Sequence, residues 1–526
     1  MEQKNFLLAM GLIASFLILW SVFVVPRFAP PAGQVTAGVA GTPTTGPGGD
    51  TVSSQTPEMR SAHAEMGEPV VLTDAILRDE NNEIVLTPQG GAVKNWRVKL
   101  KGQEVDLVLN PDTDVLPLAT FPDVRFKITT TDHKAVMQAT LSNGLHVTKT
   151  LTLSPSGYLH ELSYSFQNST AHPIELSRWT WGWGPGLGTA VGEMKENLRL
   201  IRALTLGKLK VHVIKKDEQV EFGRWAAIDN RYYLVAFIPK IVHPVELSVE
   251  GAKDQTRLSL VESTLVPANG EAVLSYELYA GPKGYTQLKK YNRALEESVD
   301  FGTFAGLGRL ILSALNRLKA LTGNYGVSII LLTMGIQLLM FPLTIKSFKA
   351  TMAMKKLQPK IAEIQSRFKS DPKRLNIEMM NLYKNSGTNP FGGCLPMILQ
   401  LPIFLALFTA LRNAYELRGA PFFGWIHDLS TPDVLMHMGT FQLHALPLVM
   451  GSAMFMQQRM SGAASDPTQK QMMTMMPIMF TFMFYGFPSG LVLYWLTNNL
   501  MTMGIQWSFQ RYKNEPGQVI ETTIVK

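Results

Sequence analysis

One uncharged run, from Gly326 to Ile345, constrains the fold of this chain more than any other feature. About 20 helical residues, at about 1.5 Å of rise each, cross the roughly 30 Å hydrocarbon core of a bilayer. The run therefore predicts a membrane-spanning helix. Gln337 lies near its middle, where an amide turned toward lipid would cost a few kcal/mol. We expect the rest of the chain to give this amide a polar partner or a wetted cavity.

Other apolar runs bring the predicted number of membrane crossings to six. An uncharged run from Asn5 to Val25 predicts an uncleaved N-terminal anchor, which we place at residues 1–28. A cleaved signal peptide is the alternative, but the run is long for one and no clean cleavage motif follows it. Four more runs follow the central one, at about 393–414, 441–458, 471–486 and 488–508. Because only "FPSG" separates the last two, we expect a tight hairpin there.

The residues between the first two crossings predict a linker and then a β domain. Residues 29–69 are rich in Pro, Gly, Thr and Ala, which is typical of a flexible linker. Residues 70–300 contain short alternating runs with turn signals between them, such as "EIVLTP", "GLHVTKTLTL", "YLHELSYSF" and "EAVLSYELYA". This pattern predicts an all-β sandwich. The single cysteine, Cys394, excludes an intramolecular disulfide framework.

An aromatic, glycine-rich stretch inside the β domain leaves two interpretations open. "WTWGWGPGLG", at Trp179–Gly188, would suit a sugar-binding site if its rings were exposed. If the rings were buried, the stretch would be a loop packed on the sandwich, and we favour this second interpretation.

Residues 301–322 predict an amphipathic helix. Apolar side chains recur at steps of three and four residues from Phe304 to Leu321, whereas Arg309 and Lys319 lie outside this stripe. Such a helix suits the bilayer interface. A surface helix packed on the sandwich is the alternative.

The loop at residues 346–388 sets the predicted orientation in the membrane. It holds ten Lys and Arg residues against the three acids Glu363, Asp371 and Glu378, and short loops of this kind stay in the cytoplasm. The β domain then lies outside and both termini lie inside, which indicates the inner membrane and periplasm of a Gram-negative bacterium.

Apolar periodicity on both sides of Asp371 predicts that the loop forms a helical hairpin of two short helices. Its charge could meet ribosomal RNA or anionic lipid, or serve topology alone. The basic residues that we single out are Lys355, Lys356, Arg367, Lys373 and Arg374.

Polar side chains recur at helical spacing within the crossings. Thr333 and Gln337 share a helix face, and further amides and hydroxyls lie in other crossings, among them Gln400, Asn498, Asn499, Thr502 and Gln506. These groups could pair from helix to helix or line a hydrated groove. We expect a groove, because the groups spread over several helices. No charged residue occurs at 385–411 or 471–510, which disfavours a transporter.

Two further patterns bear on function. Six methionines crowd "QMMTMMPIMFTFMF", including Met475, and flexible thioethers suit a surface that meets varied apolar partners, although lipid-facing filler is the alternative. The sequence contains none of the metalloprotease, nucleophile-elbow, Walker or dinucleotide motifs. We therefore expect no enzyme activity, no metal and no cofactor.

Three motifs carry a resemblance to a known family. "NPFGGCLPMILQLPIFLALF" (389–408), "APFFGWIHDLS" (420–430) and "FPSGLVLYWLTNNL" (487–500) closely resemble the YidC/Oxa/Alb membrane protein insertases. With the N-terminal anchor and the external β domain, the chain resembles the Gram-negative type over essentially its whole length. The resemblance implies a five-helix core at 323–510 and a periplasmic β-supersandwich. It also implies a hydrophilic groove closed on the periplasmic side, and a cytoplasmic hairpin needed for activity.

The resemblance also assigns roles to single residues. It places Thr333 and Gln337 in the groove, to which we add Gln400, Asn498 and Thr502. It maps Phe404, Tyr494 and Trp495 to substrate contact, to which we add Met475. Gln337 stands where family members commonly have arginine, so a mechanism built on a fixed positive charge is not expected here. The tail at 511–526 is short and weakly basic.

The expected protein is thus a six-crossing α-helical membrane protein with an all-β periplasmic sandwich. It would insert and help fold inner-membrane proteins, alone or with the Sec translocon (SecYEG, SecDF). Other expected partners are nascent membrane proteins, membrane lipids, and ribosomes or targeting factors, but not DNA. A membrane-anchored periplasmic platform for binding and assembly is the alternative function.

Overall fold

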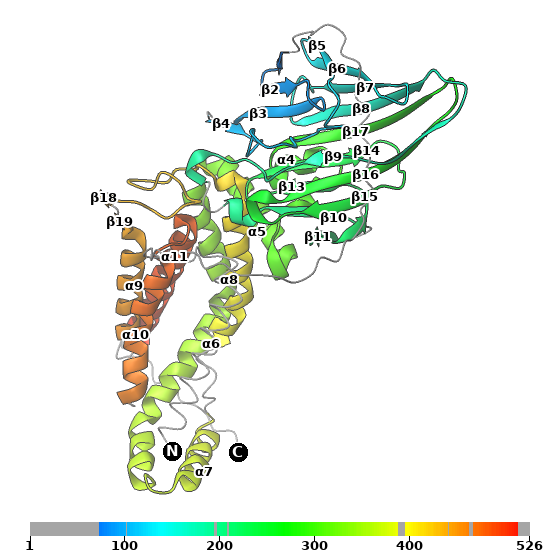
Figure 1. Ribbon diagram of the computed structural model, residues 1–526. Helices are drawn as coiled ribbons and strands as arrows, with labels where there is room; N and C mark the ends of the chain where they lie inside the picture. Colours follow the sequence, from blue (N-terminus) through cyan, green and yellow to red (C-terminus); the bar gives the residue numbers. More distant parts are fainter. Residues whose placement is uncertain are drawn as a thin grey trace, which may run out of the picture. The chain divides into compact units, whose positions relative to one another are not determined.

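The computed structural model describes residues 73–100, 103–193, 197–207, 210–387, 395–439, 441–461 and 467–513. The chain divides between Ser298 and Val299 into a β unit and a helical unit (Figure 1). The predicted anchor (1–28) and linker (29–69) lie outside the described residues, as does the predicted tail beyond Lys513.

A nine-stranded antiparallel sheet is the largest element of the β unit. Its spatial order is β11-β10-β13-β14-β17-β8-β7-β6-β5. The strands are β5 (Lys127–Thr131), β6 (Lys134–Thr140), β7 (Leu145–Thr152), β8 (Leu159–Asn168), β10 (Arg202–Leu206), β11 (Val211–Ile214), β13 (Ala226–Asp229), β14 (Tyr233–Pro239) and β17 (Glu271–Pro282). Side chains alternate between buried and partly exposed along β7, as expected of a sheet with one covered face.

Two four-stranded sheets complete the β unit, in the orders β12-β15-β16-β9 and β1-β2-β3-β4. The first contains β9 (Ile174–Trp183), β12 (Gln219–Glu221), β15 (Glu246–Glu250) and β16 (Arg257–Val266). The second contains β1 (Ala75–Arg78), β2 (Asn82–Thr87), β3 (Ala92–Leu100) and β4 (Gln103–Asp106). The four runs quoted as strands fall on β2, β7, β8 and β17, so those strand predictions are confirmed.

The three tryptophans of the aromatic stretch pack between sheets. Trp179, Trp181 and Trp183 are buried, and the Trp181 ring lies 5.1 Å from Phe237 of β14 and 4.8 Å from Tyr276 of β17. The expectation of a loop was wrong for this part, because the tryptophans belong to β9. Their burial agrees with packing and leaves no exposed ring platform for a sugar.

Short helices complete the β unit and lead into the helical unit. They are α4 (Tyr285–Lys290), η2 (Val191–Glu193), η3 (Leu198–Leu200), η4 (Lys253–Gln255), η5 (Leu295–Ser298) and η6 (Gly302–Phe304). The predicted amphipathic helix is α5 (Ala305–Thr322), which ends where Gly323 takes a left-handed conformation. It buries Ile311, Leu312 and Leu315 and packs on α6 and α8 of the same unit.

The helical unit contains a helix at every predicted crossing after the first. They are α6 (Tyr325–Arg367), α8 (Leu395–Asn413), α9 (Ala445–Ser461), α10 (Pro467–Phe484) and α11 (Ser489–Lys513). A further helix, α7 (Pro372–Asn385), follows α6 in the chain and lies beside its end (Figure 1). Asn324 starts α6 by accepting hydrogen bonds from the backbone of Gly326 and Val327, at 2.8 and 3.2 Å. By length and composition, α6 is the one described helix that could cross a membrane.

Two boundaries differ from the prediction. The first arm of the hairpin is not a separate short helix, because α6 continues without a break as far as Arg367. The second arm begins as expected, since the Asp371 carboxylate caps α7 and Pro372 occupies its first turn. The run at 441–458 becomes helical only at Ala445, because a two-stranded ribbon of β18 (Met436–Met438) and β19 (Phe441–Leu443) precedes it.

Candidate functional site

The exposed and buried faces of α6 are inverted relative to a helix of a water-soluble protein. Leu338 and Leu339 are 74% and 73% exposed. Meanwhile the opposite face is buried and polar, with Thr333, Gln337, Thr344 and Ser347. Water would favour the reverse arrangement, whereas lipid accepts the exposed leucines and disfavours exposed amides. We call the buried polar side of α6, together with the α11 residues that it meets, the α6–α11 seam.

Gln337 occupies the centre of the α6–α11 seam. Its side chain is 6% exposed, and its Nε2 donates to Asn498 Oδ1 and, at 3.3 Å, to Thr502 Oγ1. Asn498 and Thr502 lie four residues apart on α11 and so face the same way. The Gln337 amide, which was predicted to need a polar partner, thus has two from a second helix.

The two threonines on the same face of α6 use their own helix. Thr333 Oγ1 donates to the Ile329 carbonyl at 2.6 Å, and Thr344 Oγ1 donates to the Met340 carbonyl at 3.0 Å. These bonds leave the hydroxyl oxygens able to accept a further hydrogen bond. The structure therefore places Thr333 beside Gln337 on the seam but does not bond the two.

Gln400 lies at a separate contact. Its Nε2 donates to the Tyr494 hydroxyl at 3.4 Å, which joins α8 to α11. Tyr494 precedes Asn498 by four residues, so one stripe of α11 receives both the α6 and the α8 amides. Of the five predicted groove residues, Gln337, Asn498 and Thr502 therefore form one contact, Gln400 lies at a second contact on α11, and Thr333 bonds its own helix. Tyr494 as the partner of Gln400 was missed.

Aromatic side chains from three helices gather beside this stripe. The Trp495 ring lies 4.9 Å from Phe404 of α8, 5.6 Å from Phe480 and 5.3 Å from Phe484, both of α10. Phe404 and Tyr494 are buried. Met475, by contrast, is 58% exposed on α10, so it belongs to an outer apolar surface rather than to this aromatic cluster.

The loop between α8 and α9, residues 414–444, ties the helices together at one end. Its backbone carbonyls at Thr431 and Leu429 accept from Ser489 and Gly490 at the start of α11, at 2.8 and 3.0 Å. The Pro421 carbonyl accepts from Asn324, the cap of α6, at 3.2 Å. The loop includes the short helix η8 (Tyr415–Leu417). One segment thus fixes the starts of both helices that form the seam.

The same loop also holds α9 and α10. The buried Asp433 carboxylate accepts from the backbone of Leu446 at 2.9 Å and so caps α9. The Tyr485 hydroxyl, next to the end of α10, donates to the Gln442 carbonyl at 2.9 Å. Sequence reasoning missed the Asp433 cap, because the intervening ribbon places this residue far from the first helical turn in the sequence.

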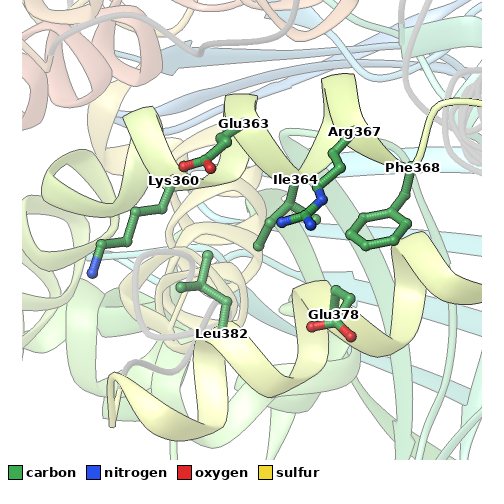
Figure 2. A pocket seen from close by; sticks show the side chains of 7 residues that line it. All are labelled: Lys360, Glu363, Ile364, Arg367, Phe368, Glu378 and Leu382. Carbon is green, nitrogen blue, oxygen red and sulfur yellow. The ribbon is translucent and has the colours of Figure 1, made fainter.

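The opposite end of α6 carries the predicted basic hairpin. Lys355, Lys356, Arg367, Lys373 and Arg374 are all exposed. A cavity of about 420 Å³ lies between the last turns of α6 and α7, and Figure 2 shows its mixture of charged and apolar side chains. It is lined by Lys360, Glu363, Ile364, Arg367, Phe368, Glu378 and Leu382. Of the singled-out basic residues, Arg367 alone lines this cavity.

Comparisons with known proteins decide the family. A family model described as the 60Kd inner membrane protein matches residues 317–516, and the YidC periplasmic domain matches residues 103–314. A membrane protein insertase YidC from Endomicrobium trichonymphae is 45% identical over 438 residues, which cover 81% of this chain and 83% of that protein. The chain belongs to the YidC family of membrane protein insertases.

Two further comparisons extend over more of the chain. A YidC insertase from Syntrophus aciditrophicus is 31% identical over 552 residues, which cover 96% of this chain and 99% of that protein. A crystal structure of an active YidC insertase with its first transmembrane domain resolved is 20% identical, at a TM-score of 0.38. That match covers 83% of this chain and 95% of the other.

Family membership confirms the resemblance seen in the sequence. The chain is a membrane protein insertase, which implies nascent membrane proteins as its substrates. YidC proteins are inner membrane proteins with a periplasmic domain, here the sheet-rich unit that precedes the helical one. Insertases are not a class of enzymes.

Proposed function

We propose that this YidC protein inserts its substrates along the α6–α11 seam, which acts as a hydrophilic groove within the bilayer. One observation carries the proposal: α6 buries its polar face and exposes its leucines, and Gln337 joins that polar face to Asn498 and Thr502 of α11. Gln400 extends the groove along α11 toward α8, and Thr333 extends it along α6.

The groove lowers the barrier for polar flanks of a substrate. A charged residue at the centre of a bilayer costs about 2.5–3.5 kcal/mol on the insertion scale. Amides and hydroxyls that exchange their mutual hydrogen bonds for bonds to the substrate or to water offset part of that cost. The apolar segment then leaves into lipid, since burial of apolar surface contributes about 25 cal/mol per Å².

The aromatic cluster and the exposed methionines guide the apolar part of the substrate. Phe404, Tyr494 and Trp495 lie beside the groove, and Met475 lies on the outer surface of α10. Unbranched and aromatic side chains adapt to many apolar shapes. This arrangement lets one site accept segments of different sequence.

The proposed topology has six crossings with both termini in the cytoplasm. The domains are an anchor (1–28), a linker (29–69), a periplasmic sandwich (70–300), an interfacial helix (301–322), a five-helix core (323–510) with the hairpin (346–388), and a cytoplasmic tail (511–526). The hairpin's excess of exposed Lys and Arg supports its cytoplasmic side. The 414–444 loop then lies at the periplasmic end, where its bonds to four helices close the groove.

The hairpin is the proposed contact with cytoplasmic partners and lipid. Its exposed basic residues fit anionic headgroups or ribosomal RNA, and the same surface suits targeting factors. Insertion proceeds alone or together with SecYEG and SecDF. None of these steps uses a bound cofactor.

The groove is tested by replacing its central amide. Gln337→Leu should lower insertion of substrates with a charged translocated tail roughly five- to tenfold, and spare uncharged tails, because only the former need polar contacts. Reconstituted liposomes containing the purified chain and short substrates of both kinds provide the measurement. Ser452→Ala on α9 is the control, since that hydroxyl lies outside the seam and already bonds the Leu448 carbonyl of its own helix at 2.9 Å. An equal effect on both tails would contradict the groove.

A further inference from the structure

Two buried N–H donors on α11 have no hydrogen-bond partner among the described residues. Asn499 is 7% exposed, and its Nδ2 lies out of contact with solvent. The Trp495 Nε1, one turn earlier, is likewise buried and unpaired. Buried polar groups in folded proteins are nearly always paired, so two orphaned donors on successive turns need an explanation.

Polar side chains on the neighbouring stripe of α11 do form hydrogen bonds with other helices. Tyr494 directly precedes Trp495, Asn498 directly precedes Asn499, and Thr502 follows Asn499 by three residues. Each of these three bonds a residue of α6 or α8. That paired stripe holds helices together. The stripe of Trp495 and Asn499 faces elsewhere, because consecutive residues point about 100° apart on a helix.

The surroundings identify where the unpaired stripe points. The Trp495 ring is held between Phe404 of α8 and the rings of Phe480 and Phe484 of α10. Three turns after Asn499 on the same side of α11, Gln510 donates to the Met460 carbonyl of α9 at 3.0 Å. The Trp495 donor therefore lies between α8 and α10, and the Asn499 donor lies on the side of α11 that bonds α9.

We propose that Asn499, assisted by Trp495, is a specificity-determining residue that donates hydrogen bonds to an oxygen in the middle of an incoming apolar segment. Both Asn Nδ2 and Trp Nε1 are donors only, so the chemistry selects an acceptor, such as a Ser or Thr hydroxyl or a carbonyl freed by proline. This inference rests on the proposed function but concerns a different contact from Gln337, which serves charged flanks.

Insertion assays with paired substrates test the assignment. One apolar segment carries a central serine and its twin carries alanine there. Asn499→Leu should lower insertion of the serine segment about three- to tenfold and leave the alanine segment unchanged. The variant should unfold at the same or a higher temperature, because it removes a buried unpaired donor. Thr497→Val is the control on the same helix, since Thr497 already donates to the Leu493 carbonyl at 2.8 Å.

A second measurement tests contact directly. With Cys394→Ser as background, Asn499→Cys should form a disulfide with a cysteine at the centre of the arrested segment. Loss of both substrates together with a lower unfolding temperature would make Asn499 structural and overturn the proposal. Unchanged insertion of the serine segment, or no disulfide, would overturn it too. Gln337→Leu, assayed on charged tails in parallel, shows separately whether the groove itself fails.

Discussion

Gln337 shows how one residue can specify an arrangement of helices. A leucine at this position could face lipid at no cost, whereas an amide needs hydrogen-bond partners. The partners of Gln337 are Asn498 and Thr502 of α11, which lie 161 and 165 residues away in the sequence. Interhelical hydrogen bonds within membranes contribute roughly 0.6–2 kcal/mol each. This is modest enough that the bonds can be exchanged for contacts with a substrate. A residue with a full charge would bind its own partners more tightly.

Gln337→Arg tests whether the seam tolerates the positive charge that the family resemblance leads us to expect at this position. We expect insertion of acidic tails to be retained or raised, because the guanidinium adds attraction, and insertion of uncharged tails to be unchanged. The reconstituted assay measures both. Collapse of insertion for every substrate would mean that the amide geometry, rather than a polar group as such, is required.

Lys149 of β7 gives the β unit a predictable dependence on pH. Its Nζ donates to the Gly91 carbonyl at 2.8 Å and to the Leu118 carbonyl, and burial lowers its pKa from 10.5 to about 7. Between those values the unfolded chain binds more protons than the folded one. The free energy of unfolding should therefore fall as the pH drops from 10.5 to 7 and level off below.

Lys149→Met should flatten that dependence, because methionine fills the site without a titrating group. Urea unfolding of the full chain, followed by tryptophan fluorescence at pH 7.5 and 9.5, gives the comparison. Lys127→Met, at an exposed position of β5, is the control and should keep the wild-type slope. The same slope in both variants would show that Lys149 is not the group responsible.

At the scale of elements, α9 and α10 approach closely at a glycine. A Cβ placed on Gly451 would lie 1.9 Å from Thr481 Oγ1, and small residues commonly allow such approaches between membrane helices. By contrast, a Cβ on Gly335 of α6 would meet nothing within 4 Å. The two glycines form a matched pair in which only one is required by packing.

Gly451→Val should lower the unfolding temperature of the detergent-solubilised chain, because overpacking costs about 1–3 kcal/mol. Gly335→Val should have a much smaller effect. Differential scanning fluorimetry of both variants makes the comparison. If Gly335→Val were the more damaging, the α9–α10 contact would not be where the helical unit is most tightly packed.

The helices were largely predictable as elements, and the exceptions have physical causes. Long uncharged runs identified α6, α8, α10 and α11, because length and apolar character alone decide what can be a membrane helix. The end of α6 was misjudged, because its apolar periodicity continues beyond the uncharged run into the basic hairpin. The predicted start of α9 was wrong, because the periodicity of a short apolar run does not distinguish a strand from a segment of buried helix.

At the scale of the whole molecule, the β unit and the helical unit have separate cores, and every proposed groove residue belongs to the helical one. Deleting most of residues 73–298 while joining the flanks should therefore preserve insertion of a small test substrate. The liposome assay on the shortened chain measures this. Loss of insertion by a chain whose helical unit remains folded would instead favour the periplasmic platform.

The sequence by itself determined most of the helices and strands, the excess of basic residues in the hairpin, and which polar groups need partners. These are local properties of composition and periodicity. Only the tertiary structure decided that Gln337 meets Asn498 and Thr502 and that Gln400 instead meets Tyr494. It also decided that Trp495 Nε1 and Asn499 Nδ2 have no hydrogen-bond partner in the part of the chain that the structure describes. Those outcomes depend on the rotation and register of packed helices, which residues far apart in the sequence fix jointly.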